Sequence, residues 1–245
     1  MGVHEALIGA IRAAAPKPDA SAKQSEKKNY SERLSNTIAR AFAGELRMAG
    51  VMDCAPLVKE DGAAYGSERR IAGGIGAKKV DVSWSTDTSG LLLGISIKTI
   101  SFPDARSGNY QKNLSNRRGD MLFEAVTLHR RFPFAVLGGL FFLDVGATSD
   151  HTDRRSSTVQ NAHDLLRLFS GRPDPAGREE QLERLYVVTY DATPGSESIE
   201  IREAGRFDEP ALDASHVLAE LLSIVADRNS DFYDFVDGVL VPRRS

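Results

Sequence analysis

The chain has 245 residues, of which 41% are hydrophobic and 27% are charged, and its formal net charge at pH 7 is −3. This composition is typical of one large folded domain, and the charge neither indicates nor excludes a nucleic-acid-binding protein. No apolar run is long enough to cross a membrane, nothing at the N-terminus resembles a secretory signal, and the single cysteine excludes a disulfide framework. We therefore expect a soluble, cytoplasmic protein without a membrane partner.

Residues 1–28 are predicted to form a short N-terminal helix and a flexible linker rich in Pro, Ser, Ala and Lys. A firmer helix is expected from Asn29 to about residue 49, because Asn29 and Glu32 have the spacing of a capping box. Glu45 lies on or beside the apolar stripe of this helix. That position suits a glutamate at the boundary of the core or in a surface ion pair.

The stretch from Lys78 to Lys98 carries the strongest pattern in the chain. Residues 78–84 alternate with period two, and residues 91–100 are apolar and β-branched, so we expect two strands joined as a hairpin. Asp81 lies on the first strand and Lys98 on the second, where a lysine among apolar residues requires an anionic partner. A carboxylate and an ammonium group presented to one place make a candidate metal and phosphate site.

Residues 101–112 are predicted to form a loop beside this site, and residues 113–131 a helix. In the loop, Tyr110 suits either contact with a ligand or anchoring of the loop itself. One face of the helix is polar, and a solvated face explains such a row as well as a functional one does. The row consists of Asn113, Asn116, Arg117, Asp120 and Glu124.

The rest of the chain predicts a buried strand at 132–146, a helix at 159–169, antiparallel strands at 184–191 and 198–203, and a helix at 210–226. Cys54 is expected to pack in the core, and Gly62 and Gly66 are expected to mark loops. Asp150, His151 and Asp153 are interpreted as a polar loop rather than a metal site. Residues 29–245 are thus predicted to be one α/β domain, with a core at about 30–145 and C-terminal strands and helices at 155–245.

Asp81 followed by Ser96-Ile97-Lys98 resembles the motif of the PD-(D/E)xK nuclease superfamily, which includes many restriction endonucleases. In that superfamily an Asp on one strand precedes a (D/E)-x-K tripeptide on the next. Ser96 replaces the acid here, as in a subset of type II restriction enzymes in which the following helix supplies the missing carboxylate. The resemblance covers roughly residues 30–145 and implies a restriction-endonuclease-like core, a mixed β-sheet flanked by helices.

The resemblance also implies roles for individual residues. Asp81, Glu124 and the main-chain carbonyl of Ile97 are expected to bind Mg²⁺ or Mn²⁺, with Asp120 as the second choice for the displaced acid and Glu45 as an extra ligand. Lys98 would orient or deprotonate the attacking water, and Ser96 would hydrogen-bond a metal-bound water. Residues expected to contact nucleic acid are Arg106, Tyr110, Lys112, Asn113, Asn116 and Arg117.

The function expected from these residues is that of a metal-dependent DNA endonuclease. It would be a type II restriction enzyme acting as a homodimer, or the nuclease subunit of a larger anti-phage defence complex. One alternative is a catalytically inactive module that binds nucleic acid or a protein partner through the same cleft. Another is an unrelated α/β protein in which Asp81 and Lys98 form a buried ion pair.

Overall fold

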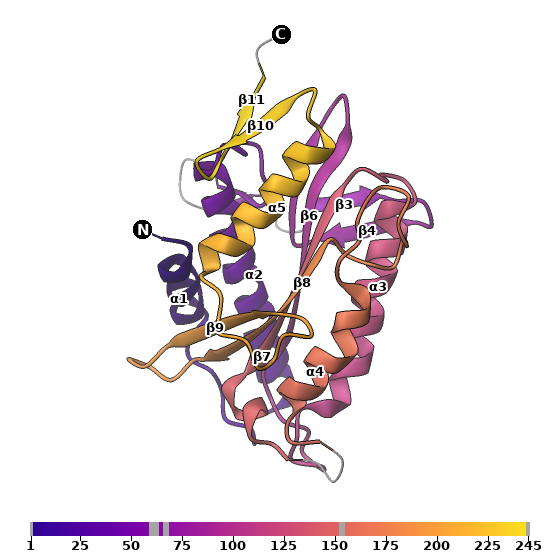
Figure 1. Ribbon diagram of the computed structural model, residues 1–245. Helices are drawn as coiled ribbons and strands as arrows, with labels where there is room; N and C mark the ends of the chain where they lie inside the picture. The colour runs from indigo at the N-terminus through magenta and orange to yellow at the C-terminus, as the bar shows by residue number, and fades with distance from the viewer. Residues whose placement is uncertain (1, 59–63, 66–68, 152–154, 244–245) are drawn as a thin grey trace.

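The computed structural model describes residues 2–58, 64–65, 69–151 and 155–243, and a five-stranded sheet lies at its centre (Figure 1). The strand order is β5-β6-β7-β8-β9, in which β6, β7 and β8 are parallel and the two outer strands are antiparallel to their neighbours. The bounds are β5 Val82–Thr86, β6 Gly90–Ile100, β7 Val136–Asp144, β8 Arg184–Asp191 and β9 Ser198–Glu203. The predicted α/β class with a mixed sheet is confirmed, and the arrangement is compatible with a restriction-endonuclease-like core.

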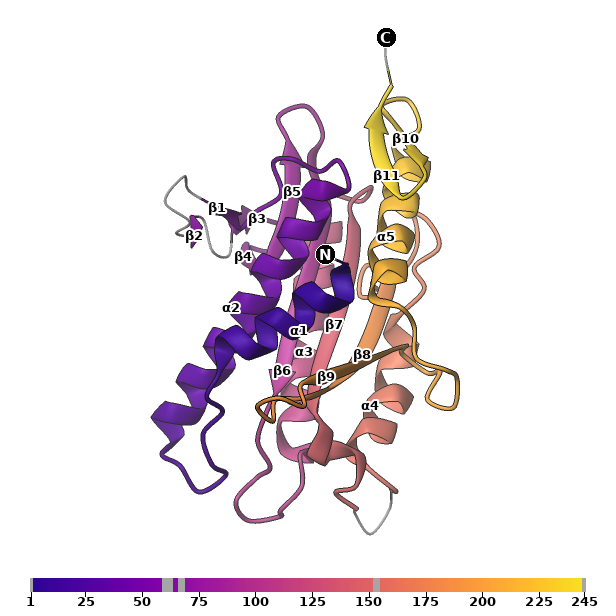
Figure 2. The ribbon, with the colours of Figure 1, turned by 90° about the vertical axis from the view of Figure 1, so that its left-hand side faces the viewer.

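Helices cover both faces of the sheet (Figure 2). On one face lie α1 (Val3–Ala14), α2 (Gln24–Met48) and α5 (Ala214–Arg228), and on the other lie α3 (Leu114–His129) and α4 (Thr158–Leu166). Side chains of a strand alternate between the two faces, so β7 sends Leu140 and Phe142 into the first layer and Phe141 and Leu143 into the second. This explains why every residue of β7 is buried and why its sequence is continuously apolar.

Within the described residues, three two-stranded ribbons accompany the sheet. They are β1 (Leu57–Val58) with β2 (Ala64–Tyr65), β3 (Arg69–Ala72) with β4 (Ala77–Val80), and β10 (Tyr233–Val236) with β11 (Val239–Pro242). Short 3-10 helices occupy Gln111–Asn113, Val145–Thr148 and Arg167–Phe169. The glycine turn at 73–76 closes the β3–β4 ribbon and leads toward Asp81.

The N-terminal boundary of α2 differs from the prediction. The helix begins at Gln24 rather than at Asn29, so residues 24–28 belong to it and not to a linker. The cap is made by the Glu26 side chain, whose Oε2 accepts a 3.1 Å hydrogen bond from the Lys23 N–H, and the expected Asn29–Glu32 cap is wrong. Helix α1 packs into the same core, where Leu7 and Ile11 are buried.

Two further expectations from the sequence concern membrane-spanning helices and the packing of Cys54. Within the described residues, no helix has both the length and the apolar character needed to span a membrane. Cys54 is buried, as expected for a packing role, whereas Gly62, Gly66 and Asp153 lie outside the described residues.

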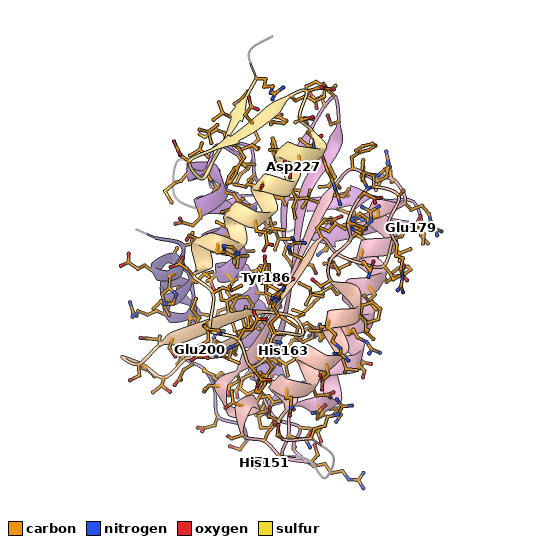
Figure 3. All side chains as sticks on the ribbon, in the orientation of Figure 1. His151, His163, Glu179, Tyr186, Glu200 and Asp227 are labelled. Atoms are coloured by element: carbon orange, nitrogen blue, oxygen red, sulfur yellow. The ribbon has the colours of Figure 1, made fainter. Side chains whose placement is uncertain are left out.

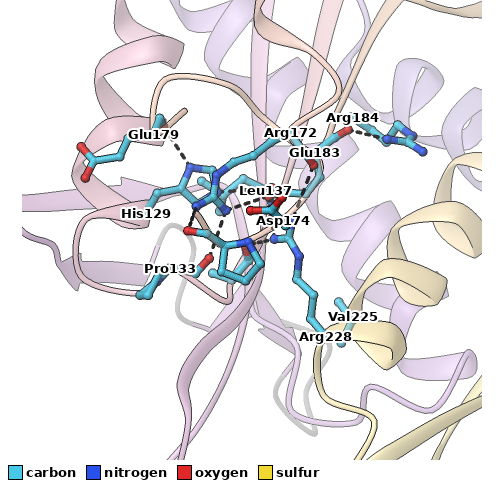
Figure 4. Close-up of polar contacts among 12 residues, drawn as sticks. His129, Pro133, Leu137, Arg172, Asp174, Glu179, Glu183, Arg184, Val225 and Arg228 are labelled. Atoms are coloured by element: carbon cyan, nitrogen blue, oxygen red, sulfur yellow. Dashed lines mark hydrogen bonds and ion pairs between the residues drawn. The ribbon is translucent and has the colours of Figure 1, made fainter. Parts of the chain in front are cut away.

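A buried ionic network ties the two layers together at one end of the sheet (Figure 4). Glu183 Oε1 accepts hydrogen bonds from Arg172 Nη1 (3.1 Å) and Arg228 Nη1 (2.6 Å). Its Oε2 accepts from the Leu137 N–H (2.6 Å) and lies 3.3 Å from His129 Nε2. Burial alone would raise the pKa of Glu183, but the hydrogen bond and charge of His129, the charge of Arg228 and the Leu137 N–H lower it to about 2.

Glu183→Gln removes the anion that neutralises two buried guanidinium groups. We expect the free energy of unfolding at neutral pH to fall by roughly 3–5 kcal/mol, the cost typical of breaking a buried ion pair. Because the folded-state pKa of about 2 lies below the usual value of 4.5, this stabilisation is present above that usual value and is lost as the pH falls toward 2. Urea denaturation as a function of pH measures both effects.

The control is Glu200→Gln, whose side chain on β9 is 58% exposed (Figure 3). This variant should unfold like the wild type. Equal urea midpoints for the two variants would contradict the role assigned to the network.

Candidate active site

Asp81 occupies the bend where the chain leaves β4 and enters β5. The prediction placed it on a strand, but β4 pairs with β3 whereas β5 pairs with β6, and Asp81 is the residue between them. Val82 is paired with Ile95, so continuing the antiparallel register by one residue brings Asp81 level with Ser96, next to Ile97. The Ile97 N–H donates a 2.6 Å hydrogen bond to Asp81 Oδ2, which fixes the carboxylate against β6.

Ser96 and Lys98 lie two residues apart on β6 and therefore face the same side, toward α3. Both donate to Glu124 of α3: Ser96 Oγ lies 2.6 Å from Oε2 and Lys98 Nζ lies 2.7 Å from Oε1. The side chains of Lys98 and Glu124 are only 12% and 16% exposed. Glu124 is thus the anionic partner that a lysine on an apolar strand requires.

A pocket of about 670 Å³ opens beside these residues. Asp81 and Lys98 line it, together with the backbone that continues from β6 to Ala105. Its other walls come from the first four turns of α2 and from residues 112–117, at the junction between the 3-10 helix Gln111–Asn113 and α3. Since α2 and α3 cover opposite faces of the sheet, the pocket extends from one helical layer to the other across the end of β6.

The donor atoms near Lys98 suit a hard divalent cation. Among the described residues, no group of three or more His, Cys, Asp or Glu side chains is arranged to hold a metal ion. The donors at hand are two carboxylates, Asp81 and Glu124, and Mg²⁺ is commonly held by one or two carboxylates while it retains several waters. Each Glu124 oxygen accepts one of the hydrogen bonds described above and keeps a second lone pair. The residues present therefore fit such a cation.

The pocket brings some of the predicted nucleic-acid-binding residues to the site. Lys112, Asn113 and Arg117 line it, and Lys112 Nζ is paired with Asp104. The hydrogen bond from Lys112 lowers the pKa of the Asp104 carboxyl. Arg106 and Asn116 are exposed nearby but do not line the pocket.

Tyr110 has the anchoring role that the sequence left open. Its side chain is 8% exposed, its hydroxyl donates to Asp144 Oδ1 at 2.8 Å, and its N–H donates to Asp150 Oδ2 at 2.8 Å. Burial and the nearby Asp144 carboxylate raise the pKa of this phenol. The side chain therefore holds the loop to the end of β7, and it is not among the residues that line the pocket.

Two predicted metal ligands lie away from the pocket. The Asp120 side chain is 61% exposed and lies 4.0 Å from Arg117, so it belongs to the solvated part of α3. Glu45 follows the last pocket-lining residue of α2, Asn36, by nine positions, about 13 Å along the helix axis. Burial raises the pKa of Glu45, as expected for a boundary glutamate.

The Asp150–His151 segment is a loop, as predicted. The carboxylate of Asp150 accepts hydrogen bonds from the Thr158 N–H (2.7 Å) and hydroxyl (2.6 Å), so it ties the loop to the start of α4. His151 lies at the periphery of the molecule (Figure 3).

The α2 wall of the pocket was not predicted from the sequence. Its residues are Gln24, Lys27, Lys28, Ser31, Glu32, Ser35 and Asn36. They occupy the face next to the buried stripe that includes Tyr30, Leu34 and Ile38. The helical spacing of these polar residues could have indicated a shared face. Residues up to 28 were expected to form a linker, however, so the first turn of the helix was not considered.

Comparisons with known proteins found no relative of this chain. No family model matches the chain, and neither the curated proteins nor the solved structures give a match.

A double-mutant cycle of Lys98→Met and Glu124→Gln tests the ion pair. We expect a coupling free energy of roughly 1–3 kcal/mol, because both side chains are largely removed from water and each single variant leaves its partner unsatisfied. Urea denaturation measures it. The exposed Lys112–Asp104 pair, whose lysine is 68% exposed, provides the control cycle and should give less than about 1 kcal/mol. Additive effects at Lys98 and Glu124 would show that the pair is not coupled.

Proposed function

We propose that this protein is a metal-dependent DNA endonuclease that hydrolyses phosphodiester bonds. The observation that carries the proposal is the convergence of Asp81, Lys98 and Glu124 at one end of β6. These residues come from a bend, a strand and a helix, and two of them line a pocket whose walls carry further basic side chains. Carboxylates beside a lysine are the groups that metal-assisted phosphodiester hydrolysis uses.

Asp81, Glu124 and the main-chain carbonyl of Ile97 would hold Mg²⁺ or Mn²⁺. The bound cation lowers the pKa of a coordinated water and neutralises charge on the phosphate. Glu124 is preferred over Asp120 because it faces Lys98 at 2.7 Å, whereas Asp120 is exposed on α3.

Lys98 supplies a fixed positive charge at the pocket. Its hydrogen bond to Glu124 Oε1 uses one of three ammonium protons, so the other two can bind a phosphate oxygen and orient a water. Ser96 holds the other oxygen of Glu124. A serine in place of the strand acid therefore positions the carboxylate that the following helix supplies.

The setting we propose is the bacterial cytoplasm, as a homodimeric type II restriction enzyme or as the nuclease subunit of an anti-phage defence complex. A second candidate function is a catalytically inactive module that binds nucleic acid through the same pocket. The observation that favours it is that both oxygens of Glu124 already accept hydrogen bonds from Ser96 and Lys98.

Cleavage of a panel of phage genomic DNA with Mg²⁺ or Mn²⁺ tests the proposal. We expect the wild type to cut, and Lys98→Ala and Glu124→Ala to lose at least about 100-fold in rate, because each removes a charged group of the reaction centre. Asp120→Ala should cut like the wild type, since the Asp120 side chain is 61% exposed and faces Arg117, whereas Glu124 is paired with Lys98.

Circular dichroism of each variant shows whether it is folded. Loss of cutting in Asp120→Ala but not in Glu124→Ala would identify Asp120, rather than Glu124, as the metal-binding carboxylate that replaces the strand acid. Metal-independent DNA binding without cleavage by the wild type would favour the inactive module.

A further inference from the structure

The strongest feature outside the reaction centre is the wall of the pocket formed by α2. Lys27 and Lys28 lie in its first two turns, on the face turned toward the pocket. Helix α2 covers the sheet face opposite α3, so these lysines approach the end of β6 from the side away from Lys112 and Arg117. Basic side chains therefore flank Asp81 and Lys98 from both helical layers.

The charges of the two walls differ in how far they are neutralised. Lys112 is paired with Asp104, and Lys98 donates to Glu124. Within the described part of the chain, neither Lys27 nor Lys28 has a carboxylate within ion-pair distance. Glu32, one turn beyond Lys28, also lines the pocket and lowers the local positive potential, but it forms no such pair with Lys28.

An aromatic ring holds one of these lysines in place. Lys27 Nζ lies 5.6 Å from the centre of the Phe102 ring, and Phe102 also lines the pocket. The ring packs edge-on against the buried Tyr30 at 5.7 Å, which fixes its position. Lys17 lies 5.5 Å from the same ring and is paired with Asp144 at the end of β7. Phe102 thus positions the Lys27 ammonium by a cation–π contact at the edge of the pocket.

We propose that Lys27 and Lys28 bind the phosphate backbone of double-stranded DNA that continues past the reaction centre toward α2. The inference rests on the proposed function and deepens it: with cations on both sides of Asp81 and Lys98, the bound chain extends in both directions from the phosphate at Lys98. The site therefore suits an internal phosphodiester rather than a chain end. Backbone contacts of this kind contribute affinity and salt dependence but no sequence preference.

Binding of a fluorescein-labelled duplex of about 20 base pairs, measured by anisotropy in EDTA from about 50 to about 200 mM KCl, tests the proposal. For Lys27→Gln with Lys28→Gln, we expect the slope of log K against log salt to become shallower by about 2, one unit for each phosphate that is no longer neutralised. The affinity at the lowest salt should fall about tenfold or more, equally for unrelated sequences.

The matched control is Arg40→Gln with Arg178→Gln, which removes the same charge from exposed sites outside the pocket. This variant should keep the wild-type slope. An unchanged slope in the lysine variant, an equal change in the control, or no DNA binding by the wild type would each overturn the proposal.

Cleavage assays on the same proteins separate this inference from the proposed function. A shallower slope for the lysine variant, together with no metal-dependent cutting by the wild type, supports the binding surface and contradicts the nuclease. Cutting by the wild type with an unchanged slope in the lysine variant supports the nuclease and overturns the binding surface.

Discussion

The ion pair between Lys98 and Glu124 is the constraint on which the site depends. Lys98 lies on a strand that is covered by helices on both faces, so its ammonium group destabilises the sheet unless an anion is close by. The carboxylate of Glu124, on the helix packed against that face, is this anion. The same contact fixes α3 relative to β6, and Ser96 fixes the second oxygen of Glu124. The structural contact and the proposed chemistry therefore coincide at Lys98 and Glu124.

The sheet explains why the site lies where it does. Strand β6 pairs antiparallel with β5 and parallel with β7. The carboxyl end of β6 therefore lies beside the bend at Asp81 and opens toward both helical layers. Ligand sites in such sheets favour the carboxyl ends of parallel strands. The ionic network around Glu183 lies apart from the pocket and holds the layers together without using any of its residues.

Local patterns in the sequence predicted the hairpin, the strand β7 and the helix α3, because spacing along one element determines which side chains share a face. These patterns indicated that Lys98 needs an anionic partner, but not that the partner is Glu124. They could not predict which parts of distant elements meet. Glu45 and Glu32 lie on the same helix, and only packing shows that Glu32 reaches the pocket and Glu45 does not. Tyr110 suited two roles, and only the fold shows that its side chain is buried against Asp144 at the end of β7. The start of α2 was misplaced because its first turn has the composition of a linker.

Direct measurement of metal binding tests the central claim most sharply. Isothermal titration with Mn²⁺ should give a binding isotherm for the wild type that is lost or strongly weakened in Asp81→Asn, which keeps the shape of the side chain but removes its charge. Thermal unfolding of the same samples would confirm that the variant is folded. Equal Mn²⁺ binding by the wild type and by folded Asp81→Asn, or no binding by either, would contradict the assignment of Asp81, Lys98 and Glu124 as a metal-dependent reaction centre.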